Sequence, residues 1–309
     1  MPLNGPGPIA RALDSDLFHS FRSTPVAVLS ALVALGITLG ALGAPWIAPF
    51  DPFDPTSLDL NNALIPPLGA QGANPSYPLG TDDQGRDILS TILYGSRISL
   101  GVGVASVLLA MVIGVVLGLV AGFAGGRLDA FIMRVADVQL SFPSILIALL
   151  INGVARAVLP MNADIDALAL AVLVVSITLA NWVNYARTVR GSAMVEKNKE
   201  YVLAARVTGV STLRIMFSHV LPNVTGPLLV IATINVATAI ITEATLSFLG
   251  VGVPPTRPSL GTMINTGNNF LYSGEWWLVV FPGIALVLLC MSVNLLGDWL
   301  RDALNPRLR

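Results

Sequence analysis

Six uncharged, strongly apolar stretches divide the chain. A transmembrane helix needs roughly 17 to 25 such residues, and each stretch comes close to or exceeds that length. The stretches cover residues 26–43, 98–123, 138–154, 167–185, 223–242 and 276–297. The pattern therefore predicts an all-α polytopic membrane protein with six transmembrane helices.

The first apolar stretch has a competing interpretation as a secretory signal. Ala41–Ala44 loosely resembles a cleavage site. However, the run of 18 residues exceeds the ~7–15 residues of a signal core. We therefore expect residues 26–43 to be a retained first transmembrane helix.

Polar segments connect the six stretches. Residues 1–25 form an amino-terminal tail, and residues 44–97 form a long segment rich in Pro, Asp and Asn that we expect to be mostly irregular. Within it, residues 88–99 predict a helix lying along the membrane surface. We expect residues 125–137 to be a short charged turn and 250–275 an irregular connection, and a charged tail follows at 301–309.

Four glycines recur every fourth residue near the end of the second stretch: Gly114, Gly118, Gly122 and Gly126. Small residues at this spacing form one smooth stripe on a helix, which lets a second helix approach closely in lipid. Glycine is also common in membrane helices generally. Four glycines in register favour a packing surface.

A charged, amphipathic loop at residues 187–222 separates the fourth and fifth stretches. We expect a helix over residues 196–208, ended by Gly209 in a left-handed conformation. Ser211 is placed to cap a second helix, and Pro222 marks the start of the next span. Ala204 and Ala205 leave a shallow face between these points. The pattern indicates a surface on which another protein docks, and we call residues 187–222 the docking loop.

Composition and charge support a membrane protein with a defined orientation. The chain is 54% hydrophobic and 11% charged, whereas soluble domains carry about 25% charged residues. Its net charge of −1 gives no reason to expect nucleic-acid binding. In the six-span arrangement, thirteen of the 17 Lys and Arg residues share one side with both termini and the docking loop. The positive-inside rule places that side in the cytoplasm.

The sequence carries no recognisable machinery for energy conversion or catalysis. It has no G-x-x-x-x-G-K-[ST] phosphate loop, so we expect it to bind no ATP itself. The six stretches contain no ionisable residue other than Tyr and Cys, which argues against an ion-coupled carrier. Cys290, His19 and His219 have no partners at ligand spacing, so we expect no metal site. An enzyme is therefore disfavoured.

Two polar helix faces are candidates for a solute path. The fifth stretch aligns hydroxyl and amide side chains at i, i+3 and i+7, and the fourth stretch repeats such a pattern. These groups face either a hydrated cavity or hydrogen-bonding partners on a neighbouring helix, and we favour the cavity. The candidates are Asn235, Thr238, Thr242, Thr178, Asn181 and Tyr185.

The opposite side of the membrane offers four further candidates. Glu243 lies about 21 residues beyond Pro222, or roughly 31 Å along a helix, which places it near the outer mouth. It is either a polar group of an outer gate or binding-protein contact, or a carboxylate held by local partners. Asp82, Asp83 and Arg86 belong to an acidic, glycine-broken stretch that lacks the later ligand of a calcium loop, and we expect it to be structural or adjacent to the gate.

Several motifs resemble one family of transport proteins. The docking loop resembles the EAA loop of ABC importer permeases, in which Ala204, Ala205, Gly209, Leu221 and Pro222 match. Leu203 and His219 depart from the acidic residue and isoleucine of that pattern. The segments YVLAARVTGVS, PLGTDDQGRDILSTILYGSRISLGVG, EATLSFLGVGVPP and NLLGDWLRDALNPRLR resemble the dipeptide/oligopeptide/nickel branch, most of all the "C" permease subunits of dipeptide importers.

The resemblance implies a type I ABC importer permease fold with a core over residues 98–300. It implies an ATPase-coupling loop that includes Arg206 and Ser211 as well as the matching residues. It further implies a bacterial inner-membrane location and partners: a homologous second permease subunit, two ABC ATP-binding subunits that hold ATP and Mg²⁺, and an external solute-binding protein. The implied solutes are di- or oligopeptides, while nickel chelates, glutathione or another peptide-like solute remain alternatives. A self-sufficient channel or carrier is less compatible with the docking loop.

Overall fold

The computed structural model describes residues 16–54, 58–158 and 165–303, and within these residues the fold is helical. About 78% of the residues are helical, and no strand is present in the described ranges. Five helices are long and apolar enough to cross a membrane, and a sixth span results if one bent helix pair is counted. The predicted all-α fold class is confirmed. The outer parts of the two predicted tails, 1–15 and 304–309, lie outside the described residues.

The helices have the following bounds, in chain order. They are α2 Asp16–Ser23, α3 Pro25–Leu42, α4 Ala44–Ile47, the 3₁₀ turn η2 Leu60–Asn62, α5 Ile88–Ala124, α6 Gly126–Leu140, α7 Ser144–Val158, α8 Ile165–Glu196, α9 Glu200–Val207, α10 Thr212–Ile215, the π-turn η3 Met216–Val220, α11 Leu221–Phe248, α12 Leu260–Phe270, the 3₁₀ turn η4 Leu271–Ser273 and α13 Trp277–Ala303.

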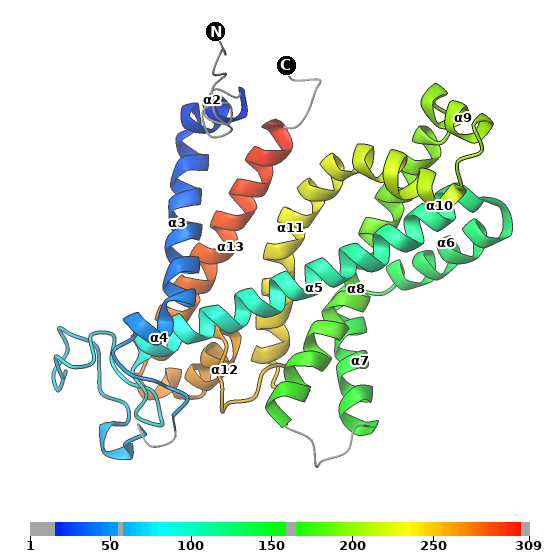
Figure 1. Cartoon of the computed structure of the whole chain (residues 1–309). Coiled ribbons are helices and arrows are strands. Elements are labelled where there is room, and N and C mark those ends of the chain that lie inside the picture. The colour runs from blue at the N-terminus through cyan, green and yellow to red at the C-terminus, as the bar shows by residue number, and fades with distance from the viewer. Residues whose placement is uncertain (1–15, 55–57, 159–164, 304–309) are drawn as a thin grey trace, which may run out of the picture.

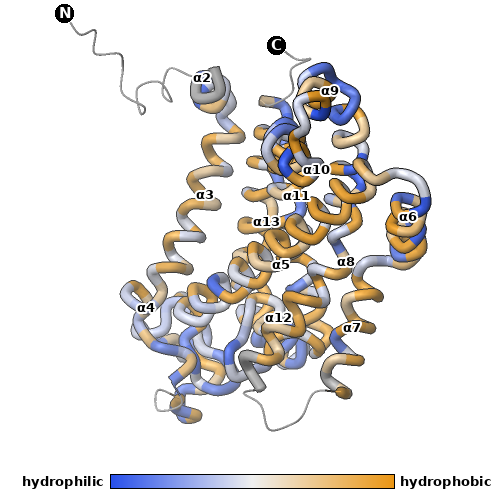
Figure 2. Tube along the Cα trace, turned by 45° about the vertical axis from the view of Figure 1, so that its right-hand side comes forward, coloured by the Kyte–Doolittle hydropathy of each residue, from blue (hydrophilic) through white to orange (hydrophobic). Residues whose placement is uncertain are grey.

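The long helices form one bundle with two different ends. Helices α3 and α13 pack side by side, α7 packs on α8, and α5 crosses the bundle in contact with both α8 and α11 (Figure 1). Helices α2, α9 and α10 and the end of α13 gather at one end, while α12 and the 48–87 segment lie at the other (Figure 1). Hydrophilic residues concentrate near these ends, and the lengths of helix between them are predominantly hydrophobic (Figure 2).

Helix α5 runs unbroken for 37 residues, which corrects the expected division into a surface helix at 88–99 and a span at 98–123. Asp87 caps the helix by accepting a hydrogen bond from the Ser90 amide at 2.8 Å. The polar residues of its first turns are buried by the chain itself. The Phe50 amide donates to the Ser90 hydroxyl at 3.2 Å, and a Cβ at Gly95 would lie 3.2 Å from the Pro258 carbonyl. This cover explains why an amphipathic pattern here does not mark a membrane surface.

The glycine stripe on α5 is a packing surface against α8, as predicted. A Cβ at Gly114 would lie 2.4 Å from the Tyr185 Cβ, and one at Gly118 would lie 2.5 Å from the Ala186 carbonyl oxygen. A Cβ at Gly122 would lie 2.9 Å from the Ala193 Cβ. These distances leave no room for a side chain, so the two backbones touch over three turns. Gly126 is not part of the stripe, because it begins α6 with φ +58°.

The expected charged turn at 125–137 is wrong, because this segment is the helix α6. The expected third span at 138–154 also begins too early. A bend of 95° separates α6 from α7, and the spanning part starts after Pro143, at Ser144. Proline lacks the amide hydrogen that a continuing helix needs. The charges of α6 are accommodated by pairing with α8, as in the Asp129–Arg190 ion pair.

Three further boundaries differ from expectation. Helix α8 continues to Glu196, well beyond the predicted end of the fourth span at 185, so the first helix of the docking loop begins only at Glu200. The expected irregular connection at 250–275 contains α12. In α12 the Ser259 side chain caps the first turn by accepting from the Thr262 amide at 3.3 Å.

Gly118→Leu should destabilise the protein, because the larger side chain must separate α5 from α8. Overpacking of this kind costs about 1–3 kcal/mol. Thermal unfolding in detergent should show a lower midpoint. The matched control is Gly101→Leu on the same helix, where a Cβ meets nothing within 4 Å. Equal stability of the two variants would contradict close packing along the stripe.

Candidate functional site

The docking loop projects from the end of the bundle that also carries α2 and the end of α13 (Figure 1). It consists of the end of α8, the short helix α9, a turn, α10 and the π-turn that leads into α11. The helix–turn–helix arrangement predicted from the sequence is therefore present.

Gly209 has the predicted left-handed conformation, with φ +79°. The amide of Val210 donates to the Ala205 carbonyl at 3.0 Å, and the Gly209 amide donates to the Arg206 carbonyl at 3.0 Å. This pair of bonds is the Schellman arrangement that ends a helix. The Thr208 hydroxyl also donates to the Ala204 carbonyl at 3.1 Å. Three carbonyls at the end of α9, those of Ala204, Ala205 and Arg206, thus accept hydrogen bonds within the chain itself.

The two alanines of the loop face different ways. Ala205 is buried with Val202 in the main hydrophobic core, whereas Ala204 is exposed. Large apolar side chains lie exposed around Ala204: Val207 is 89% exposed and Leu213 is 68% exposed. In water such a surface is unfavourable, and exposed apolar patches are typical of interaction sites.

Two contacts join the docking loop to the end of α5. The Arg206 guanidinium lies 5.7 Å from the centre of the Phe123 ring, a cation–π distance. The Lys197 ammonium donates to the Gly122 carbonyl at 2.7 Å. Displacement of α9 therefore acts directly on α5 as well as on α8. These contacts could not be predicted from local sequence patterns, because they join residues more than seventy positions apart.

The second half of the docking loop leads into α11 without a sharp break. Ser211 occupies the N-cap position of α10, but its side chain makes no capping hydrogen bond, so that detail of the prediction is wrong. Residues Met216–Val220 form a π-turn, Leu221 begins α11, and Pro222 lies in its first turn, as expected. A π-turn relieves the clash of the proline ring with the preceding turn.

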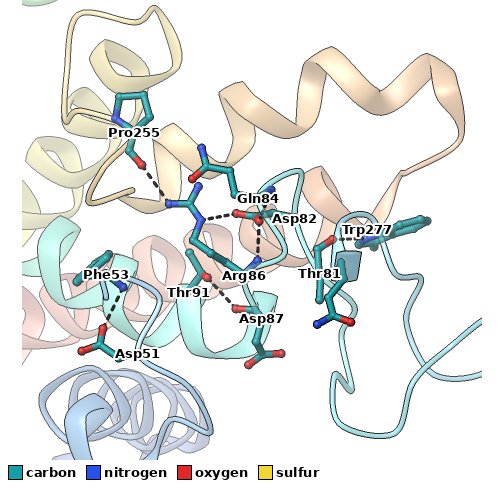
Figure 3. Close-up of polar contacts among 11 residues, drawn as sticks. Asp51, Phe53, Thr81, Asp82, Gln84, Arg86, Asp87, Thr91, Pro255 and Trp277 are labelled. Atoms are coloured by element: carbon teal, nitrogen blue, oxygen red, sulfur yellow. Dashed lines mark hydrogen bonds and ion pairs between the residues drawn. The ribbon is translucent and has the colours of Figure 1, made fainter. Parts of the chain in front are cut away.

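At the other end of the bundle, the Thr81–Asp87 stretch is a structural connection (Figure 3). Asp82 and Arg86 form a buried ion pair at 2.7 Å, and Arg86 also donates to the Pro255 carbonyl at 3.1 Å. The Trp277 ring nitrogen donates to the Thr81 carbonyl at 3.3 Å. The stretch therefore ties the start of α5 to the segment before α12 and to the start of α13.

Asp83 differs from its neighbour Asp82. It is half-buried, and its Oδ1 atom is buried without a hydrogen-bond partner. Burial raises the pKa of the Asp83 carboxyl above its ordinary value, and the adjacent Asp82 charge raises it further. An uncompensated carboxylate here costs folding free energy at neutral pH.

Glu243 is not exposed at an outer mouth, which corrects the first of its two interpretations. Its side chain is 0% exposed. The Ser99 hydroxyl of α5 and the Ser247 hydroxyl of α11 each donate to it at 2.7 Å. The Val253 amide in turn donates to Ser247 at 3.2 Å. The geometry matches the alternative expectation of a carboxylate held by local partners.

The polar face of α8 is mostly used for helix packing. Thr178 is 3% exposed and donates to the Ser106 carbonyl of α5 at 3.2 Å. Asn181 donates to the Ile177 carbonyl of its own helix at 2.9 Å. Tyr185 is fully buried under Gly114 of α5. In this conformation, Thr178 and Tyr185 therefore do not face a cavity.

The polar face of α11 is divided. Thr242 is 8% exposed and donates to the Thr238 carbonyl at 2.8 Å, whereas Thr238 itself is exposed. Asn235 is half-buried and lies against Tyr185 of α8. Neither the Tyr185 hydroxyl nor the Asn235 amide nitrogen has a hydrogen-bond partner. The two predicted faces thus meet at these two residues.

In the ranges that the structure describes, no cluster of three or more His, Cys, Asp or Glu side chains could hold a metal ion. Membrane-crossing helices and a projecting helix–turn–helix with exposed apolar residues fit the permease class of transport proteins. The chain belongs to the family of binding-protein-dependent transport system inner membrane components, whose pattern matches residues 114–309. Residues 15–67 match the N-terminal TM domain of oligopeptide transport permease C.

Relatives of nearly the same length share this assignment. The dipeptide transport system permease protein DppC of Haemophilus influenzae is 42% identical over 294 residues, which cover 95% of each chain. The oligopeptide transport system permease protein OppC of Bacillus subtilis is 39% identical and covers 96% of this chain and 91% of its own. The fold also resembles the MetNI methionine ABC transporter, with a TM-score of 0.53 at 21% identity over 70% of this chain and 96% of that chain.

Asp83→Asn should stabilise the 48–87 segment at about pH 7 and lose this advantage towards about pH 4. A raised carboxyl pKa means that folding is penalised above the ordinary Asp pKa, and protonation removes the penalty as the pH falls. Thermal unfolding across this pH range measures the effect.

The neighbouring substitution Asp82→Asn is the control for this prediction. It leaves Arg86 buried without its ion pair, so it should destabilise by about 3–5 kcal/mol. If Asp83→Asn destabilises the protein to the same extent, the assignment of an unfavourable carboxylate at Asp83 is wrong.

Proposed function

We propose that this chain is one of two permease subunits of an ATP-driven importer of di- and oligopeptides. The observation that carries the proposal is the exposed apolar surface of the docking loop, at Leu203, Val207 and Leu213, on a chain whose sequence has no phosphate loop. Such a surface fits a groove on a separate ATPase subunit. Closure of the ATPase pair moves α9, and the contacts of α9 with α5 and α8 carry the motion to the spans.

The membrane orientation follows from charge. Ten of the 14 Lys and Arg residues that the structure describes lie on α2, α6, the docking loop or the end of α13. Helix α2, the docking loop and the end of α13 lie at one end of the bundle (Figure 1). The positive-inside rule assigns it to the cytoplasm, so both termini are cytoplasmic. The 48–87 segment and α12 then face outward, where an external solute-binding protein docks. The location is the bacterial inner membrane.

The remaining partners follow from what the chain lacks. A homologous second permease subunit completes the path, and two ABC ATP-binding subunits bind ATP and Mg²⁺. This chain binds neither ATP nor a metal ion in the proposal and is not itself an enzyme.

Peptides are proposed as solutes because relatives that match along nearly the whole chain are named as dipeptide and oligopeptide transport permeases. Nickel chelates, glutathione or another peptide-like solute are the alternatives, because the permease alone does not select among them. A self-sufficient channel or carrier is disfavoured, since the only carboxylate in the described membrane-crossing part of α11, Glu243, is fully buried and held by serines.

For the solute path we propose the side of α11 that bears Thr238. Thr238 is the exposed member of its polar face, and Asn235 lies one turn away at the junction with α8. Thr178, Tyr185 and Thr242 are buried in the present conformation and come to line the path only if α8 and α11 move.

Transport by the reconstituted complex tests the function. In proteoliposomes holding the two permease subunits, the ATPase subunits and the binding protein, labelled dipeptide should accumulate with ATP and stop with vanadate. Gly209→Ala forces a non-glycine residue to φ +79°, at a cost of about 1 kcal/mol or more, and should reduce uptake per ATP hydrolysed. Gly191→Ala on α8, with no atom within 4 Å of its Cβ, is the control. Uptake of nickel or glutathione but no peptide would overturn the solute assignment.

Thiol labelling tests the path. In a Cys290→Ser background, Thr238→Cys should react with a small water-soluble reagent, at a rate that changes between the ATP-bound and nucleotide-free complex. Thr242→Cys should react more slowly than Thr238→Cys, because the Thr242 side chain is 8% exposed in the present conformation. Protection of position 238 in every state would place the path elsewhere.

A further inference from the structure

Helix α6 has a geometry that the transport function does not require. It lies at 95° to α7, across a break of a few residues. A helix that meets α7 at nearly a right angle does not continue along the direction of α7.

One face of α6 is fixed against α8. Ile132 and Ala136 are buried, at 7% and 0% exposure. Two ion pairs reinforce this contact: Asp129 accepts from Arg190 at 2.5 and 2.7 Å, and Asp137 pairs with Arg187. Since these contacts lie two turns apart along α6, they set its rotation about its own axis.

A second face of α6 is apolar and exposed. Leu128, Phe131, Val135 and Val138 follow the 3-4-3 spacing of one helix face, with exposures of 47%, 66%, 43% and 55%. Nothing in the described chain covers this stripe. It continues the apolar outer surface of α7, on which Leu146 and Leu150 are 53% and 67% exposed.

Two arginines border the apolar stripe. Arg127 and Arg134 are seven residues apart and project within about 20° of each other. Both are exposed, and neither forms an ion pair with any residue in the described ranges. Beyond these arginines, going around the circumference of α6, lies an edge with Ala130 and Asp137. The order around α6 is therefore buried face, apolar stripe, cationic border and polar edge (Figure 2 shows hydrophobic and hydrophilic residues along this helix).

We propose that α6 is an interfacial helix whose apolar stripe enters the acyl region, while Arg127 and Arg134 bind the phosphates of anionic lipids. An in-plane helix with an apolar face and basic residues at its border fits this environment. Lipid fits this surface better than a protein partner, because two arginines without ion pairs in the described part of the chain border the apolar stripe, as is typical of interfacial helices. The assignment of α6 to the cytoplasmic leaflet rests on the orientation proposed above. The contact with lipid does not depend on that orientation.

The consequence for transport lies in the connection between α6 and α8. Arg187 and Arg190 stand one turn apart on α8, close to the point where α8 enters the docking loop. Lipid bound to α6 thus holds the base of the docking loop at a fixed depth in the membrane. Anionic lipid thereby helps to position the docking loop.

A fluorescence experiment on the assembled complex tests the proposal. In a Cys290→Ser background, a bimane at Val135→Cys is read in liposomes containing nitroxide-labelled phosphatidylglycerol or nitroxide-labelled phosphatidylcholine. Both lipids should quench it, with a preference for phosphatidylglycerol of about fivefold per arginine. In the double variant Arg127→Gln/Arg134→Gln, the two lipids should quench about equally. The preference should persist in the control Arg22→Gln/Arg301→Gln, which removes two exposed arginines at the same end of the bundle.

A second labelling position keeps the test decisive. A bimane at Ala130→Cys, on the polar edge, should be quenched by aqueous iodide and little by lipid. Absence of lipid quenching at Val135 would mean that a protein covers the stripe, and equal quenching by the two lipids in the unmodified helix would mean that the arginines bind no anionic lipid. Either result overturns the proposal, and neither depends on which solute is transported.

Discussion

The close approach of α5 and α8 is the contact on which the rest of the structure depends. With no side chains at Gly114, Gly118 and Gly122, the two backbones touch over three turns. In lipid there is no hydrophobic force between helices, so association relies on such packing. Because α8 continues directly into the docking loop and α5 ends beneath it, this single contact fixes the base of the coupling element. The ion pairs of α6 with α8 are built on the same frame.

Much of the architecture could be predicted from sequence because lipid imposes simple rules. Uncharged apolar stretches of about 20 residues form helices in lipid, and glycines at every fourth residue form a face that packs against another helix. Gly209 was likewise predictable, since a left-handed helix end strongly favours glycine. These are local signals, each carried by residues close together in the chain.

The errors arose where distant parts of the chain decide the outcome. Ser90, Thr91 and Ser96 looked like an interfacial pattern, but the protein's own 48–87 segment and the loop before α12 bury them. The charged residues Asp129 and Asp137 suggested a turn, because their ion pairs with arginines of α8 are not visible in the sequence. Thr178 and Tyr185 looked like cavity residues, but they serve the α5–α8 contact. For the candidate site, therefore, the backbone of the docking loop was predictable and the direction of most side chains was not.

The length of α5 has a consequence for biosynthesis. At 1.5 Å per residue its 37 residues span roughly 55 Å, far more than the hydrocarbon core. The segment that leads into its first turn is held by contacts of Arg86 with Pro255 and of Thr81 with Trp277, which bridge 169 and 196 residues of sequence. While the ribosome is still making the intermediate helices, these two contacts cannot form. This end of the bundle can therefore complete its contacts only after α13 has been made, so the order of translation sets a limit on the order of folding.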